Sequence, residues 1–286
     1  MRKPRNLIFI VDTMGVIKQQ NGLVEVKHVI SDVDGVLRDT SRLANAATRM
    51  MFGRIGVSHD MGHETEWRIR GLEGYDSGVS PLSALLALNR AGENPRALLA
   101  MSDAKTRVDA LVKEHITPQD LERLAELYKI GIAFFNSPQV AGMVEEIQGV
   151  RVAMQSLSAN GYEISVDSNS TRESLIRDLS NIGVIEYIDI IIARDDVTRL
   201  KPAPEGILSA VTRSPIDATY TAYVGDKYED MIAARRAGVI SVGVTSGQNT
   251  RTQLEVAKPD FIFADFGEFA SELIASKRTH RDRQPV

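Results

Sequence analysis

Two aspartates separated by one residue stand at the end of an apolar segment, in a place where they can act together. Asp32 ends the strand-like run 28–32, and Asp34 follows it just before Gly35. Carboxylates at the carboxyl end of a strand lie where open α/β sheets bind their ligands. Paired carboxylates can supply a nucleophile and a general acid or base. Taken by itself, the pattern also fits an acidic loop that caps the following turn.

Three later segments place more polar side chains just beyond expected strands. Ser168 and Asn169 open a helix, whose first N–H groups attract anions. Lys201 stands before a pair of prolines that start another helix. Asp226 and Asp230 are four residues apart and therefore share one face at a helix start. Each segment alone also fits a helix cap or a solvated charge.

The four segments predict a metal site when they are considered together. Sheet topology brings them to one edge, with four carboxylates, one lysine and one hydroxyl. Carboxylates at contact distance repel by about 4 kcal/mol per pair at an effective dielectric constant of about 20, unless a cation lies among them. Oxygen ligands without His or Cys favour a hard ion, and we expect Mg2+. The expected carboxylates are Asp32, Asp34, Asp226 and Asp230.

The elements that must position these residues alternate between strand-like and helix-like patterns. Such alternation predicts an α/β fold, with a doubly wound, Rossmann-like parallel sheet between helices. The expected strands are 28–32, 162–167, 188–193, 220–225, 239–244 and 261–263. The expected helices are roughly 146–160, 171–181, 204–212, 229–237 and 252–257.

A helical segment interrupts this alternation soon after the first strand. Residues 43–140 show helical periodicity and no convincing strand, which predicts an all-helical cap domain inserted into a loop of the core, 28–42 and 141–276. Residues 1–27 form an extension with a strand-like run at 7–11 and a hairpin over 16–26 about an Asn-Gly turn. The basic tail, 277–286, is expected to fray.

Composition excludes several classes of function. The 286 residues carry 34 basic and 38 acidic side chains, a net charge of -4, which argues against nucleic-acid binding through bulk charge. With no cysteine there is no thiolate zinc site, iron–sulfur cluster or cysteine nucleophile. The apolar run 7–11 is too short for a membrane span or a signal-peptide core, so we expect a cytoplasmic protein. The oligomeric state stays open.

In their order along the chain, the four segments resemble the motifs of the haloacid dehalogenase superfamily. The motifs are D-V-D-G-V-L from Asp32, Ser168-Asn169, Lys201-Pro202, and Gly225-Asp226 with Asp230. The resemblance runs from His28 to the last expected helix and leaves 1–27 outside it. The segment 43–140 looks like the C1-type cap of phosphoglycolate-phosphatase-like members.

This resemblance implies a Mg2+-dependent phosphatase that acts on a small phosphorylated metabolite. It makes Asp32 the nucleophile that forms an aspartyl-phosphate, and Asp34 the acid that protonates the leaving oxygen and then activates water. Ser168, Asn169 and Lys201 are implied to hold the phosphate oxygens. A cap placed between the first two motifs is expected to act as a hinged lid. The implied Mg2+ ligands are Asp32, the backbone carbonyl of Asp34, Asp226 and, either directly or through a water molecule, Asp230.

Other residues invite weaker interpretations. Arg68 or Arg70, before a glycine-rich loop of the cap, is expected to meet a second anionic group of the substrate; otherwise both are surface charges. Asp12 imitates the first motif but lacks a second aspartate, which favours an added strand. The pair His59 and His63 has helical spacing without a metal motif, which favours a solvated surface.

Three rival functions remain at this stage. A sugar phosphomutase would use the same core, and only cap contacts would distinguish it. A phospho-acceptor receiver domain uses similar residues but has no long insert. A phosphate-binding protein without turnover would not need all the carboxylates. Because dehalogenase members lack an acid/base at the second aspartate, Asp34 favours phosphoryl transfer.

Overall fold

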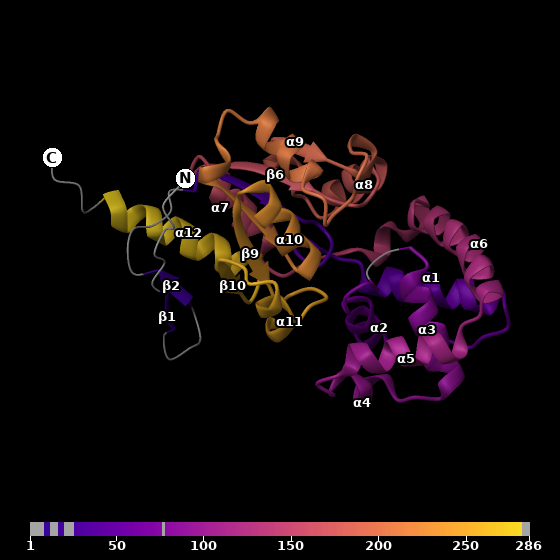
Figure 1. Cartoon of the computed structure of the whole chain (residues 1–286). Helices are drawn as coiled ribbons and strands as arrows, with labels where there is room; N and C mark the ends of the chain where they lie inside the picture. The colour runs from indigo at the N-terminus through magenta and orange to yellow at the C-terminus, as the bar shows by residue number, and fades with distance from the viewer. Residues whose placement is uncertain (1–8, 12–16, 20–25, 76–77, 282–286) are drawn as a thin grey trace. The chain divides into compact units, whose positions relative to one another are not determined.

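The computed structural model describes residues 9–11, 17–19, 26–75 and 78–281 (Figure 1). The chain divides into two compact units, of which one is Met1–Arg38 with Glu146–Val286 and the other is Asp39–Glu145. The second unit begins four residues before the expected cap segment, 43–140, and ends five residues after it. Two short strands, β4 (Arg38–Asp39) and β5 (Glu145–Glu146), pair where the chain passes between the units.

A six-stranded sheet forms the centre of the first unit. Its strand order is β10-β9-β8-β3-β6-β7, and every neighbouring pair is parallel. β3 therefore lies between β6 and β8, the strands that precede the second and fourth motifs. Observed strands end within two residues of the expected ends. They are β3 (His28–Ser31), β6 (Glu163–Asp167), β7 (Ile190–Ile192), β8 (Thr221–Gly225), β9 (Ile240–Val244) and β10 (Phe261–Phe263).

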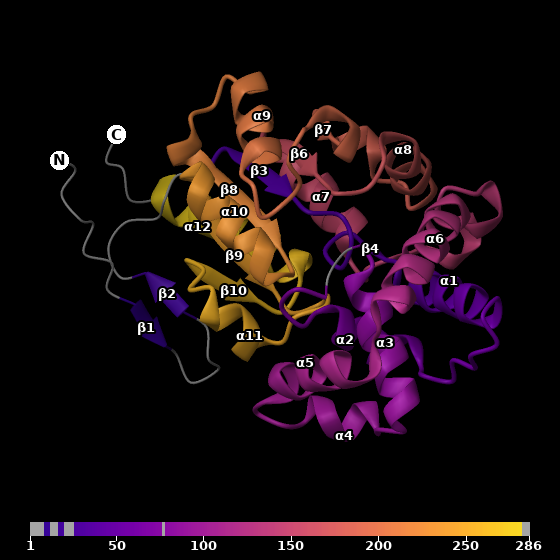
Figure 2. The ribbon, with the colours of Figure 1, turned by 45° about the vertical axis from the view of Figure 1, so that its right-hand side comes forward.

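Helices cover both faces of this sheet, which confirms the doubly wound α/β fold (Figures 1 and 2). Successive strand residues point to opposite faces, so Val29 packs in one apolar cluster and Ile30 in another. One face is covered by α7 (Val150–Ala159), α8 (Arg172–Asn181) and α12 (Phe266–Arg281). The other is covered by α9 (Glu205–Arg213), α10 (Tyr228–Ala237) and α11 (Arg251–Val256).

The two ends of the chain differ from the expectation. β1 (Phe9–Val11) and β2 (Ile17–Gln19) pair with each other in antiparallel fashion. Most of the hairpin expected over 16–26 falls outside the described residues, as does Asp12. At the other end α12 continues to Arg281, so the first residues of the expected tail are helical. A helix with an apolar face can extend into polar sequence because its backbone bonds are local.

The second unit is helical among its described residues between 43 and 140. An apolar cluster that includes Phe52, Leu85 and Val108 holds the helices together. Thr117 starts the longest one with a capping box, in which its side chain accepts from the Asp120 amide. The helices are α1 (Ser41–Gly53), α2 (His63–Arg70), α3 (Ser80–Ala91), α4 (Pro95–Leu99), α5 (Ala104–His115) and α6 (Pro118–Phe135), with a 3-10 turn at Pro138–Met143.

A buried carboxylate organises polar side chains inside the helical unit. Glu66, 1% exposed, accepts hydrogen bonds from Asn45, Thr48, His59 and Arg70 at 2.6 to 2.9 Å. Burial alone would raise the pKa of Glu66, but the His59 hydrogen bond and the Arg70 charge outweigh it and lower the pKa to about 2. His59 is therefore a buried structural residue, and the solvated surface expected for it is wrong.

Replacing Glu66 tests the contribution of this network to stability. We expect Glu66→Gln to lower the free energy of unfolding at neutral pH by about 2 to 4 kcal/mol, because the Arg70 charge loses its partner. The single tryptophan, Trp67 on α2, reports the unfolding of this unit in urea by its fluorescence. Glu64→Gln, at an exposed position of the same helix, is the matched control and should change stability by less than about 1 kcal/mol.

The difference in stability between wild type and Glu66→Gln should depend on pH. A carboxyl group whose pKa is lowered by folding contributes stability above its ordinary pKa of 4.5. That stability is lost as the pH falls through the folded-state pKa of about 2. The gap between wild type and Glu66→Gln should therefore be full at pH 7 and should shrink below pH 4.5. A gap that stays constant down to pH 2 would contradict the assignment.

Candidate active site

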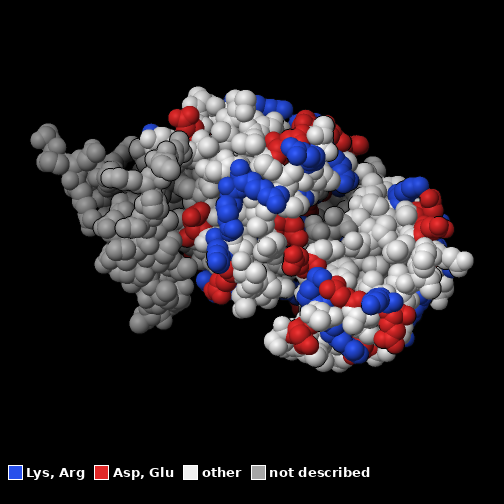
Figure 3. Space-filling view, in the orientation of Figure 1, with Lys and Arg blue, Asp and Glu red and all other residues white. Residues whose placement is uncertain are grey.

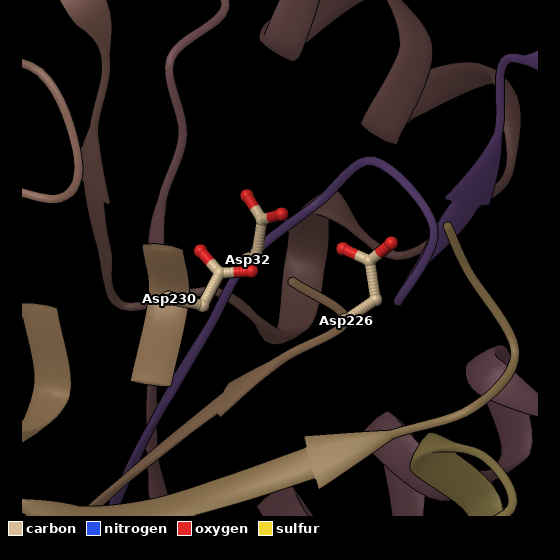
Figure 4. Close-up of side chains that lie close together, drawn as sticks. All are labelled: Asp32, Asp226 and Asp230. Atoms are coloured by element: carbon tan, nitrogen blue, oxygen red, sulfur yellow. The ribbon is translucent and has the colours of Figure 1, made fainter. Parts of the chain in front are cut away.

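Three aspartates from two strand ends and a helix meet at the carboxyl edge of the sheet (Figure 4). Asp32 follows β3, Asp226 follows β8, and Asp230 lies on the first turn of α10. One carboxylate oxygen from each lies within 4.8 Å of the others, and all three side chains are buried. The topology expected from the motifs thus brings these three predicted metal ligands together.

Lys201 is the cation in contact with this cluster. Its Nζ lies 2.7 Å from Oδ1 of Asp32 and 2.8 Å from Oδ1 of Asp230. The same ammonium donates to the hydroxyl of Tyr223 at 2.8 Å and to the Asp167 carbonyl at 3.3 Å. Burial alone would lower the pKa of Lys201, but these carboxylates raise it well above its ordinary value. Lys201 is therefore a charged group held against the predicted nucleophile.

Two glycines allow the backbone to pack closely against one oxygen of the Asp226 carboxylate. A Cβ on Gly35, which has φ of +84°, would lie 2.5 Å from Oδ2 of Asp226, and one on Gly247 would lie 2.0 Å from it. That oxygen accepts the Gln248 amide at 2.6 Å. The other oxygen, Oδ1, is buried and accepts no hydrogen bond. A buried carboxylate oxygen without a donor is costly unless a cation binds there.

The electrostatics of the cluster also favour a cation. Burial raises the pKa of Asp32 to about 6 and that of Asp226 to about 8, and the neighbouring Asp230 adds to both effects. Lys201 and Lys227 oppose the rise for Asp32, and Lys227 opposes it for Asp226. Three buried acids therefore share the charges of two lysines, and their oxygen ligands suit Mg2+.

The predicted phosphate-binding residues lie beside this cluster. Ser168 and Asn169 follow β6, the neighbour of β3 in the sheet. The Ser168 hydroxyl accepts the Ser170 amide at 3.2 Å, and Oδ1 of Asn169 accepts the Lys201 amide at 3.3 Å. Asn169 therefore joins the second motif to the third. The Lys201–Pro202 peptide bond is cis.

The side chain of Asp34 has different partners from the other three acids. Its two oxygens accept from Nε and Nη2 of Arg38, at 3.0 and 3.2 Å, and the Ser170 hydroxyl donates to one of them at 3.0 Å. The structure thus joins three of the four expected carboxylates into one cluster. The backbone carbonyl of Asp34 stays a predicted ligand.

Sequence reasoning missed several residues of this site. Tyr223 is fully buried and bonds Lys201, and Asp167 places a buried carboxyl with an unpaired Oδ2 beside the same lysine. Burial raises the pKa of Asp167 to about 7. A tyrosine and an aspartate in otherwise apolar strands are available signals for both. Arg38, directly after the first motif, was assigned no role.

The structure ties one predicted cap residue to the helical unit itself. Arg70 donates from Nε to Glu66 and from Nη2 to the Thr48 hydroxyl, both at 2.9 Å. Arg68 is half-buried on the same helix. A role for either arginine toward a substrate stays a prediction.

Comparison with known proteins identifies the family. The model for haloacid dehalogenase-like hydrolases matches residues 104–244. Phosphoglycolate phosphatase of Salmonella paratyphi A is 26% identical over 272 residues, which are 93% of this chain and 98% of that protein. The chain belongs to the haloacid dehalogenase superfamily. The range matched by the family model includes Lys201, Asp226 and Asp230, whereas Asp32 lies before it.

Two further comparisons cover different shares of this haloacid dehalogenase-like chain. The protein named "Probable phosphatase IndB" of Dickeya dadantii is 36% identical over 131 residues, and the match spans 56% of its length. The crystal structure of a HAD-superfamily hydrolase of subfamily IA from Geobacter sulfurreducens superposes with a TM-score of 0.55 at 20% identity, over 89% of this chain and 99% of that one. The second likeness shows the fold.

No helix among the described residues is long and apolar enough to cross a bilayer.

Metal binding by the cluster predicts a stability change that needs no substrate. We expect Mg2+ at 100 times its Kd to stabilise the wild-type protein by about 2.7 kcal/mol, measured as a rise in Tm. Asp226→Asn should abolish most of that rise and should leave the metal-free protein at least as stable, because it removes buried repulsion. Asp217→Asn, at an exposed position, is the control. An undiminished Mg2+ response in Asp226→Asn would place the ion elsewhere.

Proposed function

We propose that the protein is a Mg2+-dependent phosphatase that hydrolyses a small phosphorylated metabolite through an aspartyl-phosphate. The observation that carries the proposal is the Asp32 carboxylate, 2.7 Å from the Lys201 ammonium and grouped with two further buried aspartates. A carboxylate nucleophile divides one difficult displacement into two easier ones. The surrounding cations offset the repulsion between that carboxylate and a phosphate group.

In the first step, an oxygen of Asp32 bonds to phosphorus while the bond from phosphorus to the ester oxygen breaks. Asp34 gives its proton to that departing oxygen, which leaves as an alcohol. Lys201 and the Ser168 hydroxyl hold the phosphate oxygens during the transfer. Each of these groups lies at the carboxyl edge of the sheet, where α/β proteins bind phosphate.

In the second step, Asp34 takes a proton from water, whose oxygen bonds to phosphorus and releases phosphate from Asp32. Asp32, the Asp34 carbonyl, Asp226 and Asp230 would hold Mg2+. When bound, the ion would neutralise the charge of phosphate and nucleophile, which makes their approach possible. The unpaired Oδ1 of Asp226 supports this ligand set.

The name of a relative supports the proposed substrate class. Phosphoglycolate phosphatase names a small phosphate ester, and we propose substrates of that class. On the face shown in Figure 3, basic and acidic side chains are interspersed. A panel of phosphate esters that includes phosphoglycolate, hexose phosphates and nitrophenyl phosphate, assayed with and without Mg2+, tests the proposal. No phosphate release from any ester would overturn it.

The identity of the nucleophile can be tested by paired substitutions. Asp32→Asn should abolish phosphate release, because an amide oxygen is a poor nucleophile. Asp12→Asn, in the N-terminal segment that imitates the first motif, should keep wild-type turnover. Acid-quenched protein should carry covalent phosphate in the wild type and none in Asp32→Asn. The reverse pattern for the two variants would make Asp12 the nucleophile.

The acid/base role of Asp34 has a kinetic signature of its own. Asp34→Asn should lower steady-state turnover by about 100- to 10,000-fold, because neither the leaving oxygen nor water finds a proton-transfer partner. With substrates that can still phosphorylate Asp32, the phosphoenzyme of this variant should accumulate, because its hydrolysis is slow. Measuring the phosphoenzyme fraction against time separates the two steps. Normal turnover in this variant would exclude the role.

A further inference from the structure

We propose that Arg38 is the positioning residue for Asp34, an inference that rests on the phosphatase function proposed above. Arg38 follows Asp34 by four residues, directly after the first motif, and is 3% exposed. Its Nε and Nη2 donate to the two oxygens of Asp34, at 3.0 and 3.2 Å. A side-on pair of this kind fixes the plane of a carboxylate as well as its position.

The guanidinium is itself fixed from the other side by α8. Its Nη1 donates to Oδ2 of Asp178 and to the Ser174 carbonyl. Asp178 is 1% exposed and also accepts from its neighbour Arg177. Arg38 is therefore held by a second acid whether or not it contacts Asp34. The carboxylate of Asp34 can leave the guanidinium and return to an unchanged partner.

The clamp formed by Arg38 on Asp34 is connected to the predicted phosphate-binding loop by a serine. The Ser170 hydroxyl accepts from Nη2 of Arg38 at 3.1 Å and donates to Oδ2 of Asp34 at 3.0 Å. Its amide donates to the hydroxyl of Ser168, a predicted phosphate ligand. The orientation of Asp34 is thus coupled to the loop that would hold the phosphate group.

A purely structural role does not account for an arginine at this place. A buried ion pair is seldom more stable than apolar residues of similar volume, because both charges lose their hydration. The Arg38 guanidinium donates five hydrogen bonds, which are accepted by two acids, one serine hydroxyl and one backbone carbonyl. The arrangement gives orientation, and an acid/base group needs correct orientation to reach the leaving oxygen.

The clamp predicts a defect that depends on the leaving group. In Arg38→Lys the single ammonium cannot span both oxygens of Asp34 and Asp178 together. Transfer from an alkyl phosphate needs a proton from Asp34, because the bond electrons leave with a basic oxygen. Dinitrophenyl phosphate needs none, because its oxygen departs as a stable anion. The rate of the first transfer should therefore fall by about tenfold or more for the alkyl ester and far less for the dinitrophenyl ester.

The test is a single-turnover rapid-quench measurement of both esters with Mg2+ present. Arg177→Lys, at a residue whose Nε donates to Asp178, is the matched control and should behave as wild type. Ser170→Ala removes one bond to Asp34 and should show a smaller defect of the same selectivity. It also provides the test if Arg38→Lys does not fold, as judged by thermal melting. KM for the alkyl ester should stay within about twofold of wild type in each variant.

The possible results separate the inference from the function on which it rests. An equal loss for both esters, or a loss in Arg177→Lys as large as in Arg38→Lys, would overturn the positioning role while leaving the phosphatase intact. A wild type that transfers phosphate from neither ester would overturn the proposed function and the inference together. A selective loss for the alkyl ester in Arg38→Lys supports both.

Discussion

Repulsion among buried carboxylates is the constraint on which the rest of this site depends. Asp32, Asp226 and Asp230 are buried, with one carboxylate oxygen of each within 4.8 Å of the others. At such distances each ionised pair repels by about 4 kcal/mol at an effective dielectric constant of about 20. The ammonium groups of Lys201 and Lys227 offset part of that energy. The remainder favours a divalent cation, and a cation in turn permits an anionic nucleophile to meet a phosphate group.

The first motif places its two aspartates in different environments although only one residue separates them. Asp32 faces the carboxylate cluster and a lysine, whereas both oxygens of Asp34 face a guanidinium and a serine. Two carboxyl groups with distinct surroundings can take distinct roles, as nucleophile and as acid/base. The division is built into the chain by the turn at Gly35, whose positive φ directs the segment past Asp226.

The pattern of apolar and polar residues predicted the architecture well, because the signals for strands and helices lie in short stretches of the chain. Alternation of apolar strands with amphipathic helices requires a covered parallel sheet, and the carboxyl ends of such strands share one edge. That reasoning places Asp32, Asp226 and Lys201 together without any knowledge of distance. It works less well at the chain ends, where β2 pairs with β1 and α12 continues into polar residues.

The order and chemistry of the motifs were therefore sufficient to predict the fold and the members of the three-aspartate cluster with its lysine. Tertiary structure decided which partners each side chain finds. Arg38 meets Asp178, 140 residues later in the chain, and Glu66 gathers four donors from two helices and a loop. Sequence spacing does not specify such pairs, because they depend on the packing of elements that are distant along the chain. The burial that shifts the pKa values of Asp32 and Asp226 has the same origin.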